Sequence, residues 1–200
     1  MDGVRISCVY SWNCEKAKAL GASGILLDFA KNLETDIQKI REALLSLEIG
    51  KFYRKIAEIN SMSDIFDARI ASYYWMGQPD LAGELWHNYT TLLPLLVVPF
   101  QFFKIELIDN CLVRTGEVVR VGDDDFVVRY HPLIINEVGL AISGAFQEKN
   151  IGKEFSDCVK ERDLVTFHFS SFTGKMNSDN ASALDKITER SLNKFNDEHK

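Results

Sequence analysis

The sequence predicts an α+β protein, with an α-helical domain over residues 1–108 and a small β-barrel with a C-terminal helix over residues 109–200. Two patterns predict this division. Before residue 108 apolar side chains recur every three or four positions, as in amphipathic helices. After Leu112 they alternate with polar side chains, as in half-buried strands. The hydrophobic content of 46% and the charged content of 26% are ordinary for a globular protein.

In the first half, apolar spacing predicts four helices, over residues 25–47, 52–59, 65–76 and 81–92. Gly50 is expected to end the first helix, and Gly77 before Pro79 the third. Residues 4–12 alternate loosely and indicate either a short strand or an aromatic-rich tether. An aromatic group, formed by residues 73–76 and Trp86, is either a partner surface or core; its helical spacing favours core. His87 has no His or Cys three or four positions away, so we interpret it as structural or solvent-facing.

In the second half, five or so strands are expected, over residues 112–121 and 126–131, within 132–142 and 144–155, and over 164–169. Short strands with tight turns favour a closed or nearly closed barrel. Gly116 marks a bulge or a close approach within the first strand. Ser178 and Asp179 are expected to cap the final helix.

Composition restricts the partners and the compartment. The formal net charge is −6, and residues 106–200 carry −5 of it, with 12 Lys/Arg against 17 Asp/Glu. An acidic β half disfavours nucleic acid and anionic lipid as partners. The apolar run from Leu92 to Ile108 is too broken to span a bilayer, and no secretory signal begins the sequence. Four cysteines (Cys8, Cys14, Cys111 and Cys158) do not suggest a disulfide-rich module, so we expect a reducing cytoplasm.

The stretch from Cys111 to Val121, Cys-Leu-Val-Arg-Thr-Gly-Glu-Val-Val-Arg-Val, resembles the opening of the HypC/HupF chaperones of nickel–iron hydrogenase maturation. That family begins Met-Cys-Leu-Gly-x-Pro-Gly-x-Val-Val. Residues 159–168, Val-Lys-Glu-Arg-Asp-Leu-Val-Thr-Phe-His, are similar to its later strand, and residues 172–175 with the following helix to its C-terminal tail. The full-length chain resembles an uncharacterised family of helical-plus-barrel proteins.

The HypC/HupF resemblance implies an OB-like barrel and a role as an accessory chaperone, not an enzyme. It implies Cys111 and His168 as metal ligands for a transient iron that carries cyanide and carbonyl groups. The implied partners are a HypD-like maturation protein or the precursor of the hydrogenase large subunit. A thiolate and an imidazole are both suitable iron ligands. If this holds, the two side chains approach each other at the mouth of the barrel.

Two features differ from the family and leave other hypotheses open. The family's cysteine follows the initiator methionine, whereas here it follows Asn110, and its proline corresponds to Thr115. The alternatives are a protein-binding adaptor without metal handling, and an OB-type nucleic-acid-binding protein. In the simplest alternative, Cys111 is a buried thiol and His168 a hydrogen-bonded barrel histidine. No nucleophile elbow, metallohydrolase motif or dinucleotide fingerprint favours an enzyme.

Overall fold

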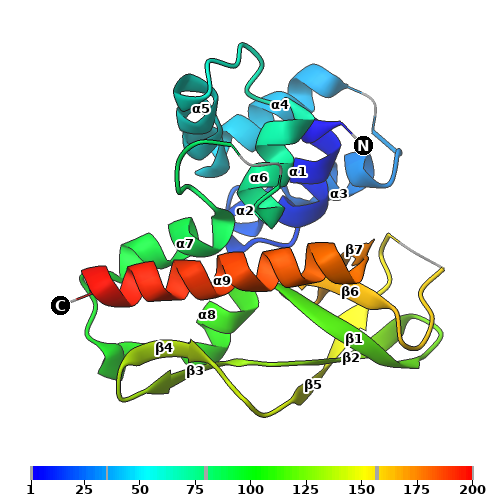
Figure 1. The fold of residues 1–200 in the computed structure, drawn as a ribbon. Helices are drawn as coiled ribbons and strands as arrows, with labels where there is room; N and C mark the ends of the chain where they lie inside the picture. The colour runs from blue at the N-terminus through cyan, green and yellow to red at the C-terminus, as the bar shows by residue number, and fades with distance from the viewer. Residues whose placement is uncertain (1, 35, 79–80, 156–157, 200) are drawn as a thin grey trace. The chain divides into compact units, whose positions relative to one another are not determined.

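The fold is α+β, as predicted, and it divides into two compact units (Figure 1). The computed structural model describes residues 2–34, 36–78, 81–155 and 158–199. The first unit comprises Met1–Leu85 and the second Trp86–Lys200. The second unit therefore begins before the expected boundary at residue 108, because the helices that follow Trp86 pack with the strands and the last helix.

All regular secondary structure in the described part of the first unit is helical. Its helices are α1 (Gly3–Ser11), α2 (Glu15–Ala19), α3 (Ser23–Ala30), α4 (Ile37–Ser46), α5 (Ile49–Ile59) and α6 (Ala68–Met76). Tyr73, Tyr74 and Trp75 are buried, which confirms that this predicted aromatic group belongs to the core, and Trp86 is buried as well. The hydroxyl of Tyr53, which is fully buried, contacts the Ser7 hydroxyl at 2.7 Å and accepts a hydrogen bond from the Trp75 indole at 3.0 Å.

Three predictions for this unit were wrong in detail. Residues 4–12, expected as a strand or a tether, form most of helix α1, which is capped by the Asp2 carboxylate. The helix predicted over residues 25–47 is divided, because Asn32 adopts a positive φ of 63° and a second helix starts after Asp36. Gly50 lies inside α5, where a Cβ would come within 3.0 Å of the Leu45 Cα, so close packing explains that glycine. Gly77 does end α6, with the expected left-handed conformation.

The second unit joins four helical segments to the strands. They are α7 (His87–Leu92), the short 3-10 helices η1 (Leu93–Leu95) and η2 (Phe100–Phe102), and α8 (Ile105–Cys111). The long helix α9 (Ser178–Glu198) follows the last strand, and it is capped by Asn177, one residue before the expected cap. No helix in the described residues is long and apolar enough to cross a membrane.

Five strands form a barrel with the order β1-β2-β5-β7-β6. They are β1 (Val113–Val121), β2 (Asp125–Tyr130), β5 (Gln147–Gly152), β6 (Leu164–His168) and β7 (Ser171–Met176). Antiparallel β1–β6 pairing brings the first and sixth strands together, whereas β5 and β7 meet through one parallel pair, Gly152 with Ser171. The barrel is therefore closed only at one point between these two strands.

Two further strands, β3 (Leu133–Asn136) and β4 (Gly139–Ile142), form a separate hairpin (Figure 1). The alternation of residues 132–142 therefore corresponds to two strands instead of one. Strand β7 was missed, because its sequence Ser-Phe-Thr-Gly-Lys-Met carries little apolar alternation.

The barrel core contains fully buried Phe126 and Val128 from β2 and Val165 from β6. Gly116 lies in a tight place there, because a Cβ on this residue would lie 3.2 Å from the Arg129 carbonyl oxygen and 3.3 Å from the Phe167 ring. This confirms a close approach at Gly116. A second core lies between the β3–β4 hairpin, the helical segments and the end of α9, and it is centred on Leu140, Leu192 and Phe195.

Candidate functional site at Cys111

Cys111 is the last residue of α8, and Leu112 alone separates it from strand β1. It therefore sits where a helix ends at the mouth of the barrel, and its side chain is half-buried. Helix ends leave carbonyl groups without partners inside the helix. At this helix end, groups from three other segments supply the partners.

The carbonyl oxygens of Asn110 and Cys111 are both held in place. The backbone N–H of Phe169 donates to the Asn110 oxygen at 2.9 Å. The Nε2 atoms of His87 and His168 lie 3.0 Å and 3.1 Å from the Cys111 oxygen. Since a carbonyl only accepts, both imidazoles carry a proton on Nε2 in these contacts. The backbone of Cys111 is thus fixed from two directions, which limits how far its thiol can move.

The two histidines lie against each other as well as against Cys111. Their rings meet edge to face with centroids 5.0 Å apart. His168 is 2% exposed. Burial lowers the pKa of His87 well below its ordinary value, the neighbouring His168 lowers it further, and the Cys111 carbonyl acts in the opposite direction. His87 is therefore neutral at physiological pH.

Lys149 adds a positive charge near the same helix end. Its ammonium donates to the Asn110 side-chain oxygen at 2.5 Å and lies 5.3 Å from the centre of the Phe167 ring. Burial lowers the pKa of Lys149 to about 8; Arg114 also lowers it, and Asp109 acts against them.

We expect this lysine to make barrel stability depend on pH. Between the folded pKa of about 8 and the ordinary value of 10.5, the unfolded chain holds a proton that the folded chain has released. Stability therefore rises with pH in this window. The difference in melting temperature of the second unit between the wild type and Lys149→Met should increase in favour of the wild type from pH 8 to pH 10. Below pH 8 this difference should stay constant. Calorimetry on both proteins measures this difference, and parallel curves would contradict it. The Lys149→Arg side chain stays charged at all these pH values. The melting temperature of this variant should therefore drop increasingly below that of the wild type as pH rises.

A buried ion pair lies below the helix end. Asp109 and Arg114 are 2.8 Å apart, and each side chain is 7% exposed. The Asp109 carboxylate also accepts hydrogen bonds from the Tyr130 hydroxyl at 2.8 Å and the Leu133 N–H at 3.0 Å. Arg114 donates in addition to the His131 carbonyl. This network joins α8 to β1, β2 and β3, and so fixes the chain on both sides of Cys111.

The donor atoms do not form a preformed metal site. Among the residues that the structure describes, no three His, Cys, Asp or Glu side chains are grouped so as to hold a metal ion. His87 and His168 use Nε2 for the Cys111 carbonyl.

Residues 93–200 match the model of a family of unknown function, DUF6390. The chain belongs to this family. The DUF6390 segment lies within the second unit and includes Cys111, His168 and α9, whereas His87 lies before it. No curated protein matches the chain, and no solved structure does.

The two predicted site residues, Cys111 and His168, meet through the Cys111 backbone, whereas the approach of thiol to imidazole and their role as metal ligands stay predictions. His168 contacts Cys111 across 57 residues of sequence, although through the backbone oxygen. His87 was missed as a member of this site, because its partners come from other segments and no local spacing marks it. Lys149 was missed for the same reason. Asn88, the neighbour of His87, binds the backbone N–H and carbonyl of Val113 and so belongs to the same helix end.

Proposed function

We propose that this chain is an accessory protein of metallocentre assembly, of the kind that matures nickel–iron hydrogenases. In this role it binds a HypD-like maturation protein or the large-subunit precursor, in the cytoplasm and without enzymatic turnover. The observation that supports the proposal is the contact between Cys111 and His168 at the barrel mouth. These are the two residues that the HypC/HupF resemblance selects.

The fixed backbone at Cys111 suits a residue that presents a thiol to a partner. Both carbonyl oxygens at the helix end are engaged, and the Cys111 side chain is half-buried, so part of it faces solvent. A thiolate binds iron strongly. Iron is the cargo in this proposal, and the partner supplies further ligands to it.

Exposed apolar side chains favour a protein partner. At the end of the second unit built on Leu140 and Phe195, Val97 is 88% exposed, Val138 79% and Phe102 67%. Val97 and Phe102 lie next in sequence to residues packed against this core, and Val138 lies in the β3–β4 turn. Exposed apolar side chains grouped in this way are a feature of surfaces that bind other proteins.

A second candidate is an adaptor that binds the same partners without handling iron. The contacts of both imidazoles with the Cys111 carbonyl favour it, because an Nε2 atom that donates a proton is not a metal ligand. In that case the two histidines only shape the helix end.

Co-expression with a HypD-like protein, followed by anaerobic purification, tests the proposal. We expect the wild-type complex to carry iron with cyanide and carbonyl bands in its infrared spectrum. Cys111→Ala should lose these bands and keep the partner, whereas Cys158→Ala, at an exposed cysteine, should keep both.

A complex without such bands would favour the adaptor. Failure of the wild-type chain to bind either a HypD-like protein or a large-subunit precursor would contradict the proposal in both forms.

A further inference from the structure

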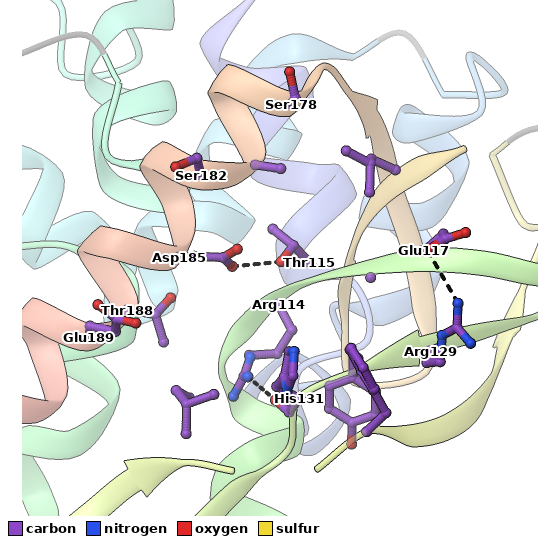
Figure 2. Close-up of a pocket in the computed structure, with 16 residues that line it drawn as sticks. Arg114, Thr115, Glu117, Arg129, His131, Ser178, Ser182, Asp185, Thr188 and Glu189 are labelled. Carbon is purple, nitrogen blue, oxygen red and sulfur yellow. Dashed lines mark hydrogen bonds and ion pairs between the residues drawn. The ribbon is translucent and has the colours of Figure 1, made fainter. Parts of the chain in front are cut away.

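A cavity of about 430 Å³ lies between α9 and the strands β1 and β2, and Cys111 is not among the residues that line it (Figure 2). We call it the α9 groove. The helix contributes Ser178, Ser182, Asp185 and Glu189 along one side, and the strands contribute Glu117 and Arg129 on the other. A cavity of this size is large enough for a long side chain with part of its backbone.

The charges in the α9 groove leave an excess of carboxylate. Arg114 is buried and paired with Asp109, and Arg129 is paired with Glu117 at 3.4 Å. Asp185 accepts a hydrogen bond from the Thr115 hydroxyl at 2.6 Å. No Lys or Arg of the described residues lies within 4.0 Å of Asp185 or Glu189 in an ion pair. The helix side of the groove therefore favours a cation.

The opposite rim is apolar and aromatic. Phe146 is 63% exposed. The centre of its ring lies 4.1 Å from the centre of the His131 ring and 5.4 Å from the Arg129 guanidinium carbon. Ile142 and Leu164 also line the cavity. An exposed aromatic ring beside carboxylates fits a ligand with an apolar stem and a cationic end.

A lysine or arginine side chain has both parts. Its methylene groups would lie against Phe146 and Ile142, and its charge would face Asp185 and Glu189. A small free amine would leave most of the cavity unfilled. An acidic ligand would face the carboxylates of Asp185 and Glu189, while the two arginines that line the groove already pair with Asp109 and Glu117.

We propose that the α9 groove binds a Lys- or Arg-containing segment of a partner protein. This inference rests on the proposed function only in that the chain acts by binding another protein. It assigns a second contact, separate from Cys111, that selects the partner by its basic side chains.

Fluorescence anisotropy with the full-length chain tests this inference. The probes are labelled hexapeptides with one central Lys or Arg between apolar residues, and the same peptides with Glu at the centre. We expect the basic peptides to bind, the Glu peptides to bind at least tenfold more weakly, and binding to weaken with added salt. The double variant Asp185→Asn with Glu189→Gln should weaken the basic peptides about tenfold, and Phe146→Ser should also weaken them.

The matched control is Asp197→Asn, an exposed carboxylate on the same helix that does not line the groove. It should bind as the wild type does. Equal affinity for the Glu peptides, or unchanged affinity in the double variant with an unchanged melting temperature, would overturn the inference. Cys111→Ala should bind the basic peptides normally. A wild-type chain that carries no iron or binds no HypD-like partner would therefore contradict the proposed function alone. A failure to bind the basic peptides would contradict only the inference about the α9 groove.

Discussion

Asp109→Ala should destabilise the second unit by about 3–5 kcal/mol, since it leaves a buried guanidinium without its counter-ion. The ion pair is 7% exposed on each side, and the substitution also removes the acceptor for the Tyr130 hydroxyl and the Leu133 N–H. Burial lowers the pKa of Arg114 and the Asp109 carboxylate acts in the opposite direction, so Asp109 favours the charged guanidinium. Hydrogen–deuterium exchange of β1 and β2 at increasing urea measures the change in this unit separately from the first.

Two controls separate the ion pair from general damage. Glu117→Ala removes the partner of Arg129, whose side chain is 43% exposed, and should cost less than about 1 kcal/mol. The double variant Asp109→Leu with Arg114→Met replaces both charges by apolar groups and should recover much of the loss. If Asp109→Ala costs no more than Glu117→Ala, the buried network does not stabilise the helix end.

Asn88→Ala should have the second largest effect, a loss of about 3 kcal/mol in the second unit. The Asn88 side chain accepts from the Val113 N–H at 2.8 Å and donates to the Val113 carbonyl at 3.0 Å, and it also donates to the Thr188 hydroxyl. It is 2% exposed. Each buried backbone group left without a partner costs about 1–3 kcal/mol. Urea-dependent exchange of the β1 amides measures the loss.

Asn196 provides a matched comparison. Its side chain bonds both the N–H and the carbonyl of Leu140, at 2.9 Å and 2.8 Å, but it is only half-buried. Asn196→Ala should therefore cost about 1 kcal/mol, because water replaces part of what is lost. Equal effects of the two substitutions would show that burial does not set the cost of these bonds.

The elements that sequence patterns predicted are those whose two faces differ. Strands β1, β2 and β6 alternate between the barrel core and the outside, and α9 buries one stripe, so their periodicity is visible. Helix α1 was missed because almost all its residues are buried. A helix covered on all sides has no polar face and hence no period, and its Val and Ile residues favour a strand locally.

The candidate site was predicted in part for a similar reason. Cys111 and His168 each stand in a recognisable stretch, so a family resemblance could select them. His87, Asn88 and Lys149 reach the same helix end only through the tertiary fold: His87 contacts Cys111 across 24 residues, and Lys149 contacts Asn110 across 39. No local spacing records such contacts, and only the assembled barrel brings them together.

The position of α9 in the chain has a consequence for biosynthesis. This helix leaves the ribosome after every other element of the second unit, yet its Leu184, Leu192 and Phe195 are almost fully buried in that unit. Until α9 emerges, the apolar surface that it covers stays open to water and to other nascent chains. Residues 1–85 form their own core and can fold during synthesis, whereas the unit that carries Cys111 can be completed only after translation of α9. The apolar core of the second unit is therefore the last part of this sequence to be covered during synthesis.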